Sequence, residues 1–321
     1  MGDDGGLFAS ADWAGGRVCG HESPEACARA AAAPPHCNTV RPGSPDKSAK
    51  PALRVREPLA TDAHSTGVTT SKHSSLDTAG AFVIIGASGG IGRGISTALA
   101  ADGAKLVLAG RSLDKLHPLA DELGGTAHEV DASDFAEVEA LLTEARGRHG
   151  RVAGVVNAVG SILLKPAHLT SEAELDETLR LNLKTAFAAV RAAARVMTEG
   201  GSVLLFSSSA AEVGLPNHEA IAAAKGAVAG LVRSAAATYA PRKLRINALA
   251  PGLVATPLAA RITGNPKSLE ASIAMHPAGR IGTVDDIVAP ARWLLDPASD
   301  WITGQVITLD GGMSRVRSAA R

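Results

Sequence analysis

The sequence predicts an α/β fold in which a doubly wound parallel sheet of about seven strands forms a single domain. Short apolar runs alternate with longer segments in which apolar residues recur with a helical period, the pattern of repeated strand–helix–strand units. The first apolar run also ends in a cluster of glycines, where a strand turns tightly into a helix. No repeat array and no second region of this kind is found in the sequence.

Each strand is expected at one of the short apolar runs, and each helix in the segment that follows it. The expected strands are Ala81–Gly86, Lys105–Ala109, Thr126–Val130, Val152–Asn157, Ser202–Ser207, Leu244–Leu249 and Gln305–Leu309. The expected helices are the segment from the glycines to Ala101, then Leu113–Leu123, Phe135–His149, Glu172–Met197, Asn217–Tyr239 and Val284–Leu295. Because helices separate consecutive strands, the strands are expected to run parallel, with helices on both faces of the sheet.

Residues 1–79 differ from the rest of the chain. They are rich in Gly, Ala, Ser, Pro and Thr and show no sustained period of helix or strand. Such a segment buries too little apolar surface to offset chain entropy, so we expect a disordered or non-native N-terminal extension. If the true start lies downstream, mass spectrometry of the native protein will find no peptides from residues 1–60. The domain itself is expected at residues 80–313, followed by a C-terminal tail at 314–321.

The charge and the cysteine content argue against several classes of partner. The chain carries 32 Lys and Arg against 32 Asp and Glu, so nothing in its net charge attracts it to nucleic acid or an anionic membrane. No segment is expected to reach the roughly 18 apolar residues of a bilayer span. The three cysteines, Cys19, Cys27 and Cys37, lie near the N-terminus without zinc-like spacing, so no metal site is expected. We expect a cytoplasmic protein with a small-molecule partner.

The first strand runs into a glycine-rich turn, Gly86-Ala87-Ser88-Gly89-Gly90-Ile91-Gly92, at which a helix begins. Glycine permits the tight turn and lets the backbone approach a pyrophosphate closely, and the free N–H groups and positive end of the helix favour its charge. The turn lies between the first strand and first helix, the context that the motif requires. The sequence therefore predicts a Rossmann-type domain that binds a nicotinamide dinucleotide, with Gly86, Ser88, Gly90, Ile91 and Gly92 among the binding residues.

The glycine spacing and an ordered set of later motifs resemble the short-chain dehydrogenase/reductase family across residues 81–313. Ile85 stands where the family usually has Thr. The later motifs are Asp131-Ala132, Asn157-Ala158-Val159-Gly160, Asn182-Leu183, the Pro-Gly loop Asn247 to Thr256, Pro277–Asp286 and Thr303–Gly312. The resemblance implies that the cofactor is contacted by Asp131, Ala132, Asn157, Ala158, Gly160, Pro251, Gly252, Val254 and Thr256.

The end of the second strand favours NADP(H) over NAD(H). A carboxylate that binds the ribose 2′-OH of NAD is expected about 20 residues beyond the glycines. Gly110 and Arg111 occupy that place. Losing the acid removes repulsion against a 2′-phosphate, and the guanidinium of Arg111 can bind that phosphate with paired hydrogen bonds.

The family resemblance implies a catalytic Ser, Tyr and Lys, with an Asn that supports a water. The Ser binds the substrate oxygen, the Tyr transfers the proton, and the Lys binds the nicotinamide ribose and lowers the pKa of the Tyr. Here the matching residues are Ser208, Lys225 and Asn182, but the position four residues before Lys225 is Ile221. Tyr239 is followed four residues later by a lysine, but Pro241 between them would break the shared helix, so we reject that pair.

Isoleucine transfers no proton, and the sequence leaves several alternatives. His218 lies three residues before Ile221 and seven before Lys225, on one helix face, and histidine suits acid–base chemistry. Lys225 itself, or a water held by Ser208 and Asn182, is a second candidate for the proton donor. A third alternative is a protein that binds NADP(H) without turnover, as a sensor or an assembly partner. The last is chemistry without an acid at this point, such as reduction of an activated C=N or C=C bond.

The substrate should lie beyond the carboxyl ends of the strands. The expected walls, Ser161–Thr170, Glu212–Ala220 and Leu253–Ser272, carry aliphatic residues and no Phe, Tyr or Trp. Lys165 and Arg261 could recognise an anionic substrate, although solvated loop charges explain them as well. The resemblance also implies a homotetramer or homodimer that buries the alanine-rich helices Glu172–Met197 and Asn217–Tyr239 between subunits.

Overall fold

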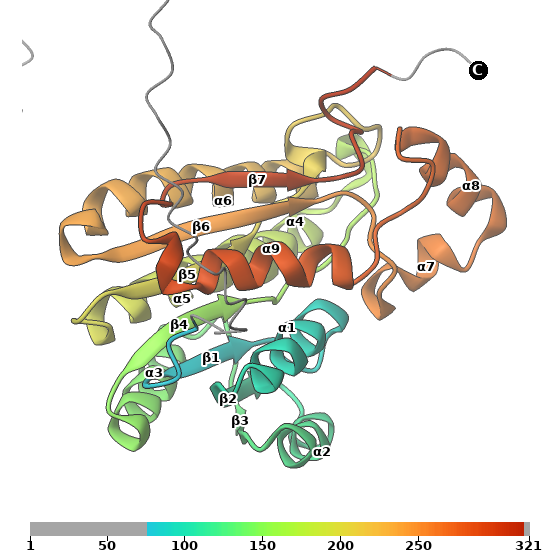
Figure 1. Ribbon diagram of the computed structural model, residues 1–321. Helices are drawn as coiled ribbons and strands as arrows, with labels where there is room; N and C mark the ends of the chain where they lie inside the picture. Colours follow the sequence, from blue (N-terminus) through green and yellow to red (C-terminus); the bar gives the residue numbers. More distant parts are fainter. Residues whose placement is uncertain (1–75, 318–321) are drawn as a thin grey trace, which may run out of the picture. The chain divides into compact units, whose positions relative to one another are not determined.

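Seven parallel strands form one sheet in the order β3-β2-β1-β4-β5-β6-β7 in the computed structural model, which describes residues 76–317 (Figure 1). The strands are β1 (Ala81–Ile85), β2 (Lys105–Gly110), β3 (Thr126–Glu129), β4 (Val152–Asn157), β5 (Gly201–Phe206), β6 (Leu244–Pro251) and β7 (Val306–Leu309). β1 and β4 are neighbours in the sheet and pair in parallel. The chain adds β2 and β3 on one side of this pair and β5 to β7 on the other. This arrangement confirms the predicted doubly wound, Rossmann-type sheet, and it places a crevice at the carboxyl ends of β1 and β4.

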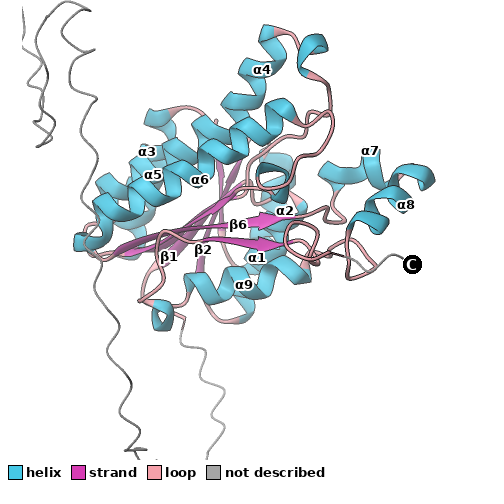
Figure 2. Cartoon of the chain, turned by 90° about the horizontal axis from the view of Figure 1, so that it is seen from above, coloured by secondary structure: helices cyan, strands magenta, loops and turns pink. Residues whose placement is uncertain are grey.

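Helices cover both faces of the sheet (Figure 2). One face is packed by α3, α5 and α6, and the other by α1, α2 and α9. The helices are α1 (Gly90–Ala101), α2 (Leu113–Leu123), α3 (Phe135–His149), α4 (Glu172–Leu179), α5 (Thr185–Val196), α6 (Glu219–Tyr239), α7 (Ala260–Thr263), α8 (Pro266–Met275) and α9 (Asp285–Leu295). Of these, α7 and α8 lie in a segment that the sequence analysis treated as a substrate wall without assigning helices to it.

The central strand β1 contributes side chains to two separate hydrophobic cores, because successive side chains of a strand point to opposite faces of the sheet. Val83 and Ile85 are buried in the core beneath α3, α5 and α6. Phe82 and Ile84 are buried in the other core, which α1 and α9 cover. Burial on both faces explains why this strand is apolar at every position and shows no alternation in the sequence.

The long helix expected at Glu172–Met197 is interrupted in the structure. Between α4 and α5, Arg180–Lys184 forms one π-helical turn with Asn182 buried inside it. The amide of Asn182 donates a hydrogen bond of 2.9 Å to the carbonyl oxygen of Thr178. Single π turns within helices occur frequently at functional sites. The helical period of the sequence continues through this turn, so the pattern alone does not reveal it.

The described chain packs onto the domain slightly beyond both predicted boundaries. Leu76 is buried, and Asp77 forms an ion pair of 3.1 Å with Arg151, before the expected start at residue 80. Within the expected tail, Arg315 pairs with Glu212 and Ser314 donates to Asp310. The remainder of the expected extension at 1–79, including its three cysteines, lies outside the described residues.

One helix departs from the expectation that no segment could span a membrane. By length and composition alone, the helical stretch Glu219–Arg242 is apolar enough to cross a bilayer. Half of its most apolar window is buried inside the fold, where α6 packs against β5 and β6. Packing against a sheet accounts for this apolar character.

Candidate active site

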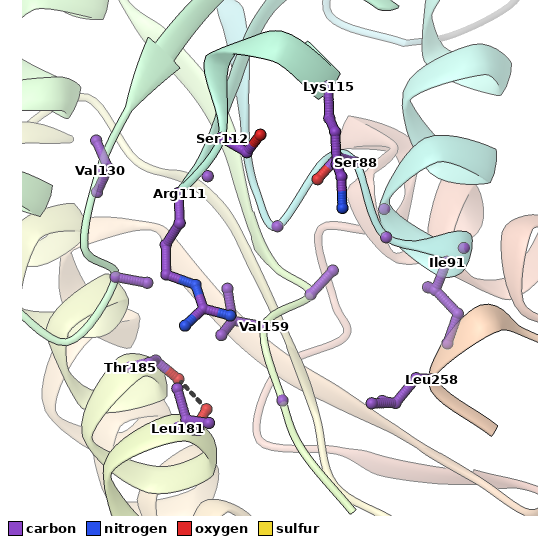
Figure 3. A pocket seen from close by; sticks show the side chains of 18 of the residues that line it. Ser88, Ile91, Arg111, Ser112, Lys115, Val130, Val159, Leu181, Thr185 and Leu258 are labelled. Carbon is purple, nitrogen blue, oxygen red and sulfur yellow. Dashed lines mark hydrogen bonds between the residues drawn. The ribbon is translucent and has the colours of Figure 1, made fainter. Parts of the chain in front are cut away.

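Two adjoining cavities open at the carboxyl ends of the strands. The first is lined by the turns that follow β1, β2, β3 and β4 (Figure 3). The second lies beside it, against the ends of β5 and β6 and the first turns of α6. They share the lining residues Ile91, Ala158, Val159, Gly160, Thr256 and Leu258. An elongated ligand can therefore extend from one cavity into the other.

Two glycines of the turn after β1, Gly86 and Gly92, have no room for a side chain. Gly86 has a φ of +84°, and a Cβ on it would lie 3.0 Å from the backbone carbon of Ala158. A Cβ on Gly92 would lie 2.2 Å from the carbonyl oxygen of Gly86. Gly89 begins α1 without a side-chain hydrogen bond, and the first turn carries no acidic residue. The first N–H groups of α1 therefore face the cavity without a side-chain acceptor, which suits an anion.

Two basic side chains flank this turn, and Figure 3 shows both extending into the first cavity. Arg111 follows β2 directly, and Lys115 lies in the first turn of α2. Within residues 76–317, neither Arg111 nor Lys115 forms an ion pair or a side-chain hydrogen bond. Both charges are therefore available to a ligand. Arg111 is predictable from its place after the second strand, whereas Lys115 is not, because a lysine in the first turn of a surface helix has no distinguishing pattern in the sequence.

Asp131, at the end of β3, lines the same cavity and orders its own turn. Its carboxylate accepts hydrogen bonds from the backbone N–H of Ser133 at 2.9 Å and the hydroxyl of Ser133 at 2.8 Å. These bonds, together with the nearby charges of Arg180 and Lys184, lower the pKa of Asp131. The next residue, Ala132, is buried and lines the cavity.

The turn after β4 is fixed by two buried asparagines. Asn157 donates to the hydroxyl of Thr185 at 3.2 Å and accepts from the N–H of Val159 at 3.3 Å. Asn182 donates to the hydroxyl of Ser161 at 3.0 Å and accepts from its N–H at 3.2 Å. A Cβ on Gly160 would lie 3.0 Å from the Asn182 amide oxygen, so this glycine lets the turn close on α4 and α5. The side chain of Asn182 thus has its donors and acceptor occupied within the protein.

Lys225 lies at the back of the second cavity. Its side chain is buried at 8% exposure, and its ammonium donates a hydrogen bond of 2.9 Å to the carbonyl oxygen of Phe206. Burial lowers the pKa of Lys225 to about 8, because an ammonium ion loses hydration there. Among the described residues that line this cavity, Lys225 is the only one with a titratable side chain.

Ser208 faces the same cavity from the end of β5. Its hydroxyl oxygen accepts a hydrogen bond from the N–H of Ala210 at 3.2 Å, while its contact with the carbonyl oxygen of Pro251 is long, at 3.5 Å. The neighbouring Ser207 and Ser209 are buried and donate to the carbonyl oxygens of Lys225 and Pro251 at 2.9 Å and 3.1 Å. Ser208 is therefore the serine of this run whose hydroxyl is most available.

Ile221 occupies the wall one helical turn before Lys225. It is 5% exposed and lines the second cavity with Lys225 and Ser208. The single tyrosine of the chain, Tyr239, ends α6 beneath Arg242 and lines neither cavity. His218 caps the start of α6, where its Nδ1 lies 2.8 Å from the carbonyl oxygen of Pro216, and it lines neither cavity.

The loop after β6 closes the second cavity and rests on a buried histidine. The Nδ1 of His276 bonds the carbonyl oxygen of Ser272 at 2.6 Å, which leaves Nε2 to accept from the N–H of Leu253 at 3.3 Å. A Cβ on Gly252 would lie 2.6 Å from that Nε2, so only glycine fits between the imidazole and the cavity. His276 was not among the predicted residues of this loop, which were Pro251, Gly252, Val254 and Thr256, because its role depends on contact between segments distant in sequence.

Comparison with known proteins decides the family. Residues 86–314 match the family model described as enoyl-(acyl carrier protein) reductase. A galactitol 2-dehydrogenase from Cereibacter sphaeroides is 37% identical over 236 residues, which cover 71% of this chain and 92% of the relative. A levodione reductase from Leifsonia aquatica is 32% identical over 261 residues, covering 76% and 98%. A solved short-chain type dehydrogenase/reductase from Mycobacterium ulcerans superposes with a TM-score of 0.71 at 30% identity, covering 74% and 91%.

The chain belongs to the short-chain dehydrogenase/reductase family. Members of this family use NAD(H) or NADP(H), and the first cavity of this short-chain dehydrogenase/reductase fits such a dinucleotide. A Cβ at Gly92 would close the glycine turn, the start of α1 has no side-chain acceptor, and two unpaired cations stand nearby. These features suit a pyrophosphate and a further phosphate.

The structure brings most of the sequence-predicted residues together in this short-chain dehydrogenase/reductase. Ser208, Lys225 and Asn182 surround the second cavity, and the cofactor-binding candidates line one or both cavities, apart from the buried Asn157 behind them. His218 lies outside both. Lys165, a candidate for anion recognition, is paired with Glu174 at 2.7 Å.

Proposed function

We propose that this chain is an NADP(H)-dependent oxidoreductase that interconverts a carbonyl group and an alcohol on a small molecule. The observation that carries the proposal is the position of Ser208 and Lys225 on one cavity, which continues into the cradle formed by the glycine turn. A protein that only binds the cofactor needs no hydroxyl at Ser208. In an enzyme, this hydroxyl can donate a hydrogen bond to the carbonyl oxygen of a substrate in the second cavity.

The preference for NADP(H) rests on charge. β2 ends at Gly110 and is followed directly by Arg111, with no acidic residue at either position, and Lys115 adds a second cation to the lining of the cavity. A 2′-phosphate would find positive partners there and no carboxylate at the end of β2 to repel it, since the carboxylate of Asp131 lies at the end of β3. NAD(H), which lacks this phosphate, would gain nothing from either side chain.

The cofactor, when bound, supplies or accepts a hydride at its nicotinamide. The remaining tasks fall to the residues of this chain. Ser208 donates a hydrogen bond to the substrate oxygen, Lys225 holds the ribose, and the loop from Pro251 to Thr256 excludes water. Because Ile221 transfers no proton, we propose that the ammonium of Lys225, directly or through a water beside Ser208, supplies the proton to that oxygen. The placement of His218 outside the cavity favours Lys225 over the histidine.

A second function has one observation in its favour. Ile221 is an apolar side chain at the wall where the family has its proton-transferring Tyr, and it supports a protein that binds NADP(H) without turnover, as a sensor or an assembly partner. We place this behind the enzymatic function because Lys225 and Ser208 are both retained in the cavity.

Calorimetry and turnover together test both functions. The full-length chain is titrated with NADPH and with NADH, and NADPH oxidation is then followed with a panel of ketones and aldehydes. We expect tighter binding of NADPH and slow but measurable oxidation. Binding without oxidation on any member of the panel would support the second function. Absence of heat with either cofactor would contradict both.

We also propose a cytoplasmic homodimer or homotetramer formed through α5 and α6. The support is a set of exposed small residues on α6, Ala223, Gly226, Ala227 and Gly230, together with Phe187 of α5, an aromatic side chain that is about half exposed. Exposed apolar faces of this kind are typical of contacts between subunits.

A further inference from the structure

The second cavity is lined mainly by aliphatic side chains. Ile162, Ile221 and Leu253 line this cavity alone, and Ile91, Val159 and Leu258 line it together with the first cavity. Lys225 at its back is the one titratable group among the described lining residues. A ligand that fills this space therefore exchanges water for apolar contacts over most of its surface.

Large apolar side chains are exposed at the mouth of the cavity. Leu258 is 55% exposed and Ile162 is 39% exposed, and both line the cavity from different loops. Leu164, close to Ile162 in the loop after β4, is also exposed. Exposed apolar side chains that gather around a cavity mark a site where an apolar surface binds.

Few polar groups in the cavity remain available. The amide of Asn182 is occupied by Ser161 and Thr178. Ser207 donates to a backbone carbonyl, and so does Thr256, at 3.4 Å. What remains is the hydroxyl of Ser208, the free N–H groups of Lys225, and the O–H of Ser161, whose oxygen already accepts from Asn182. Ser208 and Lys225 serve one substrate oxygen, and a substrate with several further hydroxyls would leave most of them without water and without side-chain partners.

The charges near the mouth do not favour an anionic substrate. Lys165 is neutralised by Glu174, whose carboxylate also accepts hydrogen bonds from the N–H and the hydroxyl of Ser171. Arg261, on α7, does not line the cavity. An anionic group in the cavity would therefore meet Lys225 alone, deep beyond an apolar entrance.

We propose that the substrate is an uncharged, largely apolar ketone, or the corresponding secondary alcohol, with a single oxygen function. This inference rests on the proposed function. In the reduction, the carbonyl carbon gains a hydride with its two electrons from the reduced nicotinamide, and the carbonyl oxygen gains one proton. A ketone and NADPH with one proton thus give a secondary alcohol and NADP⁺.

A pair of ketones of similar size tests the substrate class. Octan-2-one is apolar apart from its carbonyl, whereas L-erythrulose carries three hydroxyls. With the full-length chain and NADPH, we expect kcat/KM for octan-2-one to exceed that for L-erythrulose by at least about 100-fold, since each unpaired hydroxyl costs roughly tenfold. Leu258→Asn should reduce this ratio by roughly tenfold, because the amide removes apolar contact and offers a hydroxyl a partner. Leu175→Asn, an exposed leucine of α4 outside the cavity, is the matched control and should leave the ratio unchanged.

The outcomes separate this inference from the proposed function. Equal or better turnover of L-erythrulose would overturn the inference while leaving an active NADPH-dependent enzyme. A ratio that changes as much in Leu175→Asn as in Leu258→Asn would also overturn it. Calorimetric binding of NADPH without its oxidation by either ketone or by any member of the carbonyl panel would overturn the proposed enzymatic function, and the substrate class with it.

Discussion

At the scale of single residues, the chemistry of the site depends on the pair Ile221 and Lys225. Both side chains are buried in the wall of one cavity, one turn apart on α6. The isoleucine contributes no proton of its own. The lysine keeps a single hydrogen bond to a backbone carbonyl. Restoring a hydroxyl at position 221 and following the titration of Lys225 are therefore the most direct tests.

Ile221→Tyr should raise the rate of carbonyl reduction by about 10²- to 10⁴-fold, the usual contribution of a positioned general acid. The phenol would lie one helical turn from Lys225 and face the cavity that Ser208 lines. The measurement is steady-state NADPH oxidation with a ketone substrate. Ile221→Phe adds the same ring without the hydroxyl and should give no such increase. Equal rates in the two variants would show that the proton is not what limits the wild-type enzyme.

The activity should depend on the protonation of Lys225. Burial lowers its pKa from the ordinary value of 10.5 to about 8. A proton donor must be protonated, so the rate of reduction should fall as pH rises through about 8. A profile measured at saturating NADPH checks this. A rate that stays flat from pH 6.5 to 9.5 would contradict the role of Lys225 as the acid.

The lowered pKa of Lys225 also predicts that the free energy of unfolding depends on pH. Below about pH 8, Lys225 is protonated in both folded and unfolded chains, so the folded state carries the full cost of a buried ammonium. Between about pH 8 and 10.5 the folded chain binds fewer protons than the unfolded chain, and the free energy of unfolding rises with pH. Urea unfolding should show wild type gaining stability relative to Lys225→Met across this window. Parallel curves for the two proteins would contradict the predicted shift.

Arg111 and Lys115 should decide between the two dinucleotides. Removing either charge leaves the 2′-phosphate with one cationic partner, so Arg111→Ala and Lys115→Ala should each weaken NADPH binding by roughly 10- to 100-fold. NADH lacks the phosphate and its Kd should change little. Calorimetric titration with both cofactors measures this, and Lys105→Ala, an exposed lysine that starts β2, is the control. Equal losses for NADH and NADPH would show that these residues bind some other part of the dinucleotide.

At the scale of elements, the start of α1 lacks the side-chain cap that stabilises most helix starts, and its free N–H groups are available to an anionic ligand. Gly89 begins the helix without a side-chain cap and with an ordinary φ of −75°, which other residues can adopt. Most helices gain from a cap of Ser, Thr, Asp or Asn at this position. The helix forgoes that gain and keeps its first N–H groups available.

Gly89→Asp should therefore separate stability from binding. The carboxylate can accept hydrogen bonds from the first turn, so the free energy of unfolding should stay the same or rise by about 0.5–1 kcal/mol. The same carboxylate would repel a pyrophosphate, and NADPH binding should fall by at least about 100-fold. Thermal unfolding and calorimetry provide the two readouts. Gly89→Ala adds a Cβ without charge and controls for its close approach to Gly86. Undiminished binding in Gly89→Asp would exclude the α1 start as the pyrophosphate site.

At the scale of the whole molecule, the sequence was sufficient for the sheet because its central strands are buried on both faces. Strands such as β1 and β4 form continuous apolar runs, and the helices between them are long enough to cross over. The residues of the glycine turn could be named because their function depends on fixed spacing along the chain. Thr185 and His276 could not, since each reaches the site through contacts between distant segments, and Lys115 could not because a lysine in the first turn of a surface helix has no distinguishing pattern. The π turn around Asn182 was hidden because the helical period continues across it.

The proposed oligomer makes a further prediction about the whole molecule. Gly226 and Gly230 are exposed on α6, and a Cβ on either would meet nothing within 4 Å in the described chain. Within one subunit, Gly230→Arg should therefore fit without a clash and stabilise the helix by roughly 0.5–1 kcal/mol. Between subunits that pack through α6, the same side chain would clash and bring two charges into an apolar contact. Sedimentation should show the wild type as a dimer or tetramer and Gly230→Arg as smaller species. An unchanged mass in this variant would place the subunit contact elsewhere, and a monomeric wild type would leave the exposed face of α6 without the partner that we propose.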